Sequence, residues 1–143
     1  MSVKNKYNLL SLLFYLVGCC VAGFVAVFLQ FKGVSNTQIG VVTGSACVLS
    51  IFLAPWLSSL LMKIEGLSVN RLLCMLYVFM GLLFCGMAWL PIPVILVMGG
   101  YVMLYSLYLS TAPMLQVMAS GYAQEGEEVN FGLARGLGSV SWA

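Results

Sequence analysis

The sequence predicts an all-α integral membrane protein with four transmembrane helices and the start of a fifth. Of the 143 residues, 62% are hydrophobic and only 7% are charged, whereas a soluble domain usually carries about 25% charged residues. Long uncharged apolar runs recur along the chain and are separated by short polar or proline-containing breaks. Because about 20 apolar residues suffice for a helix to cross a bilayer, each long run predicts a span.

The first predicted helix covers residues 7–31. Lys4 and Lys6 precede this uncharged run, and Lys32 ends it. Small residues recur every four positions from Gly18 onward, and such a face lets a second helix approach closely. Ordinary helix contacts and a position beside a substrate are both open interpretations of Gly18.

The next three predicted helices cover residues 38–62, 72–90 and 94–118. Ser35 followed by Gln38 has the spacing of a capping box, so the second helix is expected to begin there. No charge interrupts the chain from residue 72 to residue 124, which is too long for one span. The prolines in Leu90-Pro91-Ile92-Pro93 divide it, because proline cannot continue a helix.

The fourth predicted helix carries polar residues on two faces. At 100° per residue, one arc of about 80° holds a tyrosine-rich set, which consists of Tyr101, Tyr105, Tyr108, Ala112 and Gln116. This face suits a water-filled cavity, because the Gln116 amide cannot be satisfied in lipid. Alternatively, the tyrosines are packing groups bonded to neighbouring backbones. Gly99, Ser106 and Ser110 lie nearly opposite and suit close helix contact.

The fifth predicted segment covers residues 131–143. In a helix, Arg135, Ser139 and Trp142 lie on one face, with Arg135 and Trp142 about 10 Å apart along the axis. A guanidinium is a rigid fork of donors that suits neighbouring hydroxyls or a carboxylate, and an indole can stack on a sugar ring. The alternative is that Arg135 snorkels to lipid phosphates.

This segment also resembles a known family. Its residues Asn130-Phe131-Gly132-x-Ala134-Arg135-x-x-Gly138-x-x-x-Trp142-Ala143 are similar to the start of the fifth helix in lactose permease-like sugar–proton symporters of the major facilitator superfamily. In that family the matching arginine binds substrate hydroxyls and the matching tryptophan stacks on the sugar. A glutamate on the fourth helix pairs with that arginine, and Gln116 takes its place here.

The resemblance implies a fold of twelve helices in two six-helix halves. This chain would then be an incomplete N-terminal transporter domain, the first part of a six-helix half, and the missing C-terminal part would be a partner. The expected function is secondary active transport, with sugar or oligosaccharide:cation symport by alternating access. The expected partners are a polar solute, a coupling cation and the lipid bilayer, without a cofactor. The candidate substrate-binding residues are Arg135, Trp142, Gln116, Tyr105, Tyr108 and Gly18.

Two other functions stay open. One is a drug or metabolite exporter of the same superfamily, and the other is a four-helix membrane scaffold that transports nothing. An enzyme is not expected, because the chain has no histidine and shows no nucleophile–base pair. The five cysteines lack metal-ligand spacing, and a net charge of +2 does not suggest a nucleic-acid partner.

The basic residues predict the orientation. If the N-terminus is cytoplasmic, then Lys4, Lys6, Lys63 and Arg71 are inside, and only Lys32 is outside. A multi-pass protein of the cell (inner) membrane with a cytoplasmic N-terminus is therefore expected.

Overall fold

The computed structural model describes residues 3–64 and 68–124, together with Gly136. These residues form five α-helices and one π-helical segment, and no strand occurs among them. The elements are α1 (Val3–Gly18), η1 (Cys19–Gly23), α2 (Val25–Phe31), α3 (Asn36–Lys63), α4 (Val69–Trp89) and α5 (Val94–Gln124). The predicted fifth segment, residues 131–143, lies outside the described residues apart from Gly136.

The predicted helix over residues 7–31 is helical along most of its length but bent, and the sequence did not predict this bend. The chain is helical from Val3, passes through the π-helical segment Cys19–Gly23, and resumes as α2 after Phe24. The parts Ser11–Gly23 and Val25–Phe31 meet at an angle of 46°. A π-helical turn and an interrupted hydrogen-bond ladder are common causes of a sharp kink, and both coincide here.

The turn between α2 and α3 is fixed by local hydrogen bonds. Gly33 has a φ of 86°, which a glycine adopts without strain. Its amide donates to Gln30 O and the Val34 amide donates to Leu29 O, both at 2.9 Å, in the pattern of a Schellman motif. Val34 and Leu29 are buried, as the hydrophobic contact of that motif requires.

The predicted capping box at the start of α3 is confirmed. The Gln38 amide donates to Ser35 Oγ, and the Ser35 amide donates to Gln38 Oε1 at 3.0 Å. The break between α4 and α5 is also confirmed, because α4 ends at Trp89 and α5 begins at Val94. However, α5 continues to Gln124, six residues beyond the predicted end.

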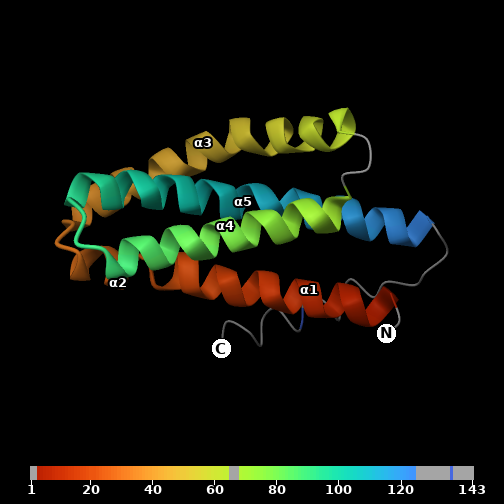
Figure 1. The fold of residues 1–143 in the computed structure, drawn as a ribbon, viewed down its shortest axis with the longest axis horizontal. Helices are drawn as coiled ribbons and strands as arrows, with labels where there is room; N and C mark the ends of the chain where they lie inside the picture. Colours follow the sequence, from red (N-terminus) through yellow and green to blue (C-terminus); the bar gives the residue numbers. More distant parts are fainter. Residues whose placement is uncertain (1–2, 65–67, 125–135, 137–143) are drawn as a thin grey trace.

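Helix α5 occupies the centre of the arrangement (Figure 1). It packs most extensively against α3, then against α4, and also contacts α1 and η1. In Figure 1, α3 lies on one side of α5, and α1, η1 and α2, together named the first span, lie on the other. Ser106, Ser110 and Thr111 on α5 are fully buried and donate to carbonyls of their own helix at 2.7–3.0 Å. Small buried residues of this kind allow helices to approach closely.

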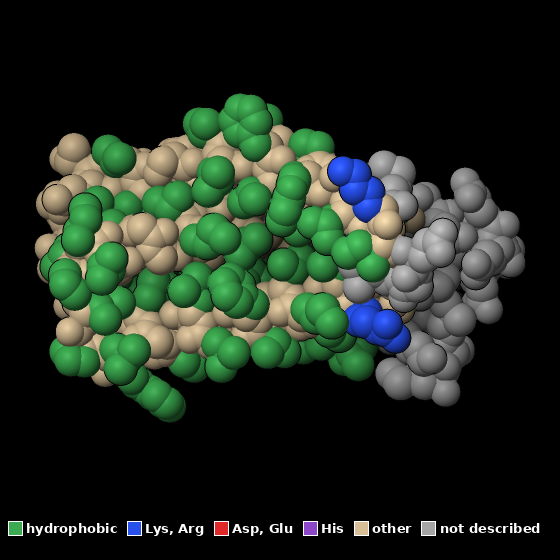
Figure 2. Space-filling view, turned by 45° about the horizontal axis from the view of Figure 1, so that its top comes forward, with side chains coloured by type: hydrophobic (Ala, Val, Ile, Leu, Met, Phe, Trp, Pro, Cys, Tyr) green, Lys and Arg blue, Asp and Glu red, His purple; other side chains and the backbone are tan. Residues whose placement is uncertain are grey.

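The surface is that of a membrane protein. Three helices are long and apolar enough to cross a bilayer, namely α3, α4 and α5, and the bent pair of α1–η1 and α2 makes a fourth if it is one span. Hydrophobic side chains cover the face shown in Figure 2 along the helices, while Lys and Arg side chains gather at one end. Exposed large hydrophobic side chains occur on all five α-helices, so the described helices carry an apolar belt, as expected for helices surrounded by lipid.

Candidate functional site

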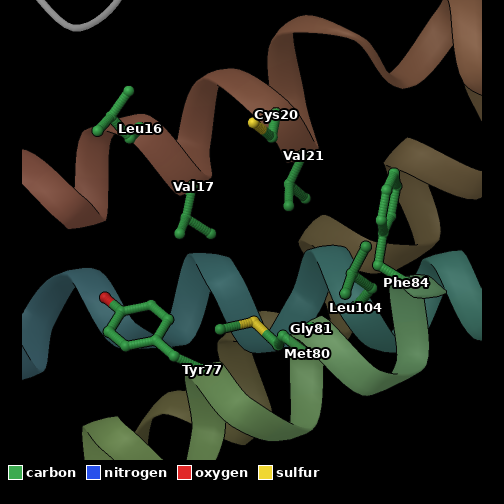
Figure 3. Close-up of a pocket in the computed structure, with 9 residues that line it drawn as sticks. All are labelled: Leu16, Val17, Cys20, Val21, Tyr77, Met80, Gly81, Phe84 and Leu104. Atoms are coloured by element: carbon green, nitrogen blue, oxygen red, sulfur yellow. The ribbon is translucent and has the colours of Figure 1, made fainter.

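A cavity of about 260 Å³ lies between the first span and the helices α4 and α5. Its lining residues are Leu16, Val17, Cys20, Val21, Tyr77, Met80, Gly81, Phe84 and Leu104. Figure 3 shows Val17 and Val21 pointing from the first span toward Met80 and Leu104. The cavity therefore lies against the π-helical segment, where π-bulges are frequently associated with functional sites.

The lining of this cavity is almost entirely apolar, and its rim reaches the molecular surface. Leu16, Cys20 and Gly81 are exposed, and a Cβ on Gly81 would have no heavy atom within 4 Å. The gap between the first span and α4 is therefore open on the surface that carries the apolar belt. An apolar cavity with a few nearby polar groups is the usual form of a small-molecule site.

Tyr77 provides the polar group at one end of the cavity. Its ring lines the cavity, and its hydroxyl is buried without a hydrogen-bond partner among the described residues. The Thr111 side chain lies close to this hydroxyl, but the pair does not meet hydrogen-bond geometry. The Thr111 hydroxyl donates instead to Tyr108 O at 2.7 Å. A buried hydroxyl without a partner costs about 1–3 kcal/mol.

Tyr108 stands next to this position on α5. Its ring stacks on Phe14 of α1 at a centroid distance of 5.1 Å, and its hydroxyl lies against the backbone of Gly18. Tyr15 packs on the same Phe14 ring, with ring centroids 5.3 Å apart, and the phenols of Tyr77 and Tyr105 also lie near that of Tyr108. Gly18, Tyr77 and Tyr108 all lie near the middle of their spans, so these phenols gather at the mid-depth of the helices.

Tyr101 links α5 to the π-helical segment. Its side chain is fully buried, and its hydroxyl donates to Val21 O. Its ring also packs beside Phe28 of α2, with ring centroids 5.8 Å apart. Tyr101 therefore contacts the first span on both sides of the bend, and one of these contacts is to the backbone.

The structure brings some of the predicted site residues together. Gly18 and Tyr108 are in direct contact, and Tyr105 is half-buried one helical turn before Tyr108. Gln116 is exposed near the end of the apolar part of α5, two turns beyond Tyr108. The residues that line the cavity include neither Tyr105 nor Tyr108. Arg135 and Trp142 lie outside the described residues.

Sequence reasoning missed Tyr77 and the cavity-lining residues of the first span. Tyr77 stands alone in an apolar helix, where a tyrosine is unexceptional, and its missing hydrogen bond depends on tertiary packing. The π-helical segment had a weak signal in the run of small residues Gly18-Cys19-Cys20-Val21-Ala22-Gly23. Such a run permits a distortion but does not specify one.

The described residues offer no metal centre. Within residues 3–64 and 68–124, no three His, Cys, Asp or Glu side chains group as metal ligands would. The cysteines are all free thiols, and Cys20 is the one that lines the cavity. Comparison of the chain with protein-family models, with curated proteins and with solved structures finds no match.

Proposed function

We propose that this chain forms part of the solute pathway of a secondary active transporter, with a sugar or oligosaccharide as solute and a cation as coupling ion. The observation that carries the proposal is the buried Tyr77 hydroxyl, which lacks a hydrogen-bond partner among the described residues and stands beside the cavity. Polar groups within a membrane domain are costly, and those that persist usually mark a substrate or ion pathway.

The surrounding phenols support the same function. Tyr15, Tyr77 and Tyr105 lie near the phenol of Tyr108, and Tyr77 and Tyr108 lie near the middle of α4 and α5, the depth at which secondary transporters bind their solutes. A phenolic hydroxyl both donates and accepts a hydrogen bond. Such groups therefore match a solute that presents several hydroxyls, while the apolar lining matches its less polar face.

The resemblance of residues 130–143 supplies the sugar assignment. Under this proposal Arg135 grips solute hydroxyls, Trp142 stacks on the ring, and Gln116 orients Arg135 in place of a carboxylate. Further helices complete the pathway, and one group of helices rocks against the other to give alternating access. We also propose that the N-terminus is cytoplasmic and that the protein resides in the inner membrane.

Direct binding measurements test this function. The full-length protein that contains this chain, with the further helices proposed above, is purified in lipid nanodiscs and titrated with radiolabelled neutral and acidic sugars, in the presence and absence of sodium and across a pH range. We expect saturable binding that weakens at least tenfold in Arg135→Ala and in Arg135→Lys, since lysine lacks the bidentate fork. Tyr77→Phe weakens binding severalfold, whereas Thr37→Ala at the exposed start of α3 does not.

The same titration separates the alternatives. Saturable binding of hydrophobic organic cations without any sugar binding would favour the exporter. Binding of neither class by a folded protein would contradict solute transport and favour the scaffold. Sugar binding that is equally tight in the parent, the Arg135 variants and Tyr77→Phe would still support transport, but it would show that the sugar binds at a different site.

A further inference from the structure

The first span is built as a hinged element. Its two parts meet at 46° around Phe24, directly after the π-helical segment Cys19–Gly23. Phe24 has φ −100° and ψ 11°, outside the α-helical region, and no side chain caps α2 at this residue. The backbone is therefore irregular at a single place in an otherwise helical span, and hinges consist of a few residues of this kind.

One side chain from another helix holds the irregular segment. In an uninterrupted α-helix, Val21 O would accept a hydrogen bond from the amide of residue 25. In the structure, the buried Tyr101 hydroxyl of α5 donates to Val21 O across a sequence separation of 80 residues. A carbonyl at this depth needs a partner, because lipid offers none. Tyr101 thus supplies the bond that keeps the bent backbone satisfied.

The two ends of the first span are held unequally. Beyond the bend, α2 is joined to α3 by the Schellman turn, and Lys32 Nζ donates to Ala88 O at 2.9 Å. On the other side, the described contacts between α1 and α5 are few and include the stack of Phe14 on Tyr108 and the contact of Tyr108 with Gly18. If the bend changes, α1 is therefore the part that moves. Since Leu16, Val17, Cys20 and Val21 line the cavity, movement of α1 opens it.

We propose that the segment Cys19–Gly23 is a hinge about which α1 swings away from α4 and α5, and that the Tyr101–Val21 hydrogen bond latches the hinge closed. The hinge controls access to the cavity from the gap between α1 and α4. This inference rests on the packing of the first span and does not depend on the identity of the solute.

Pulsed electron–electron resonance distances test the latch in the full chain in nanodiscs. Nitroxides are attached through a keto amino acid at Leu9 of α1 and Phe52 of α3, both exposed, so that the native cysteines stay in place. Leu9 is 15 residues from Phe24, a lever of about 22 Å, so a partial straightening moves it by several ångströms. A second pair, Phe52 with Leu82 of α4, reports on the rest of the bundle.

We expect Tyr101→Phe to add a longer Leu9–Phe52 distance, with the open-to-closed ratio raised roughly fivefold, the usual effect of one lost hydrogen bond. The Phe52–Leu82 distance stays as in the parent. Ser45→Ala is the control, because it also removes one hydroxyl, but one that donates only to carbonyls of its own helix α3. Gly18→Ala, which forces α1 off Tyr108, should open the same hinge.

Two results would overturn the latch. One is a Leu9–Phe52 distribution that is identical in the parent, Tyr101→Phe and Gly18→Ala. The other is a broadening of both distance pairs together, which would indicate general loosening of the bundle instead of motion at the hinge.

Discussion

The Tyr108 hydroxyl rests on the backbone of Gly18, and no residue larger than glycine fits beneath it. A Cβ at Gly18 would overlap the hydroxyl oxygen and come within 2.8 Å of Cζ. This contact joins α1 to α5 near the middle of both spans, next to the stack of Phe14 on Tyr108. It fixes how closely the first span can approach the central helix.

Gly18→Ala should therefore destabilise the protein. Overpacking of this kind costs about 1–3 kcal/mol, measured as a shift of thermal unfolding in detergent. Tyr108→Phe in the same chain removes the overlapping oxygen but leaves Cζ, so it should restore part of the loss. Gly86→Ala on α4 is the control, because a Cβ there meets no heavy atom within 4 Å. An equal effect of Gly18→Ala and Gly86→Ala would contradict the close contact.

Tyr77→Phe should leave the protein as stable as the parent or make it more stable. The substitution removes a buried hydroxyl that has no hydrogen-bond partner among the described residues, and with it a desolvation cost of about 1–3 kcal/mol. Thermal unfolding in detergent measures the effect. A loss of more than about 1 kcal/mol would show that the hydroxyl is bonded in the folded protein, through Thr111 or through water.

Lys32→Met should weaken the end of the molecule where α2 and α4 meet. The Lys32 ammonium donates to Ala88 O in the last turn of α4, where a cation also interacts favourably with the helix dipole. We expect a loss of about 1–2 kcal/mol, because the bond is charge-assisted and partly buried. Lys63→Met, at an exposed side chain at the end of α3, should cost less. Equal costs would mean that the bond to Ala88 contributes nothing.

Ser35→Ala should fray the start of α3. Loss of an N-cap typically lowers the free energy of unfolding by about 1 kcal/mol. Ser35 is exposed, so the loss here should not exceed that value, because water can replace the hydroxyl. Amide hydrogen exchange in the first turn of α3 is the direct measurement. Thr37→Ala, two residues later, should leave exchange there nearly unchanged. The capping box would have no energetic role if the two variants exchanged alike.

The turns that follow α2 and α4 should be accessible from the same side of the membrane. The bond from Lys32 to Ala88 places these two turns at one end of the molecule. Probes introduced near Lys32 and Ile92 should both react with an impermeant reagent added from outside, and probes at Lys4 and Glu127 should not. Labelling at only one of the two turns would contradict the packing, and labelling at Glu127 would reverse the predicted orientation.

Most boundaries of the helices were predictable from the sequence, because they depend on local chemistry. The two prolines after Leu90 end a helix in any tertiary context. Ser35 and Gln38 begin one through hydrogen bonds between residues only three positions apart. The extension of α5 to Gln124 was not predicted, because hydropathy identifies only the apolar part of the helix, which ends at Val117. Helical propensity continues there without the apolar pattern.

The bend and the mid-depth phenols could not be predicted in the same way. Hydropathy depends only on the composition of a segment. Because a bent span and a straight span can have the same composition, hydropathy does not reveal the bend. The bond that satisfies Val21 comes from Tyr101, 80 residues later. The sequence predicted the tyrosine-rich face of α5. It could not predict that Tyr101 and Tyr108 are buried while Tyr105 is half-buried, because burial depends on where the first span crosses this face.

The central place of α5 has a consequence for biogenesis. Chains are synthesised from the N-terminus, so α1, α2, α3 and α4 all leave the ribosome before the helix that most of them pack against. Until α5 inserts, the carbonyl of Val21 lacks the hydrogen bond from Tyr101. Helix α3 also lacks its main packing partner, which is α5. Assembly of these described helices must therefore wait for α5, and a ribosome stalled before residue 94 would leave loosely associated helices that membrane quality control can recognise.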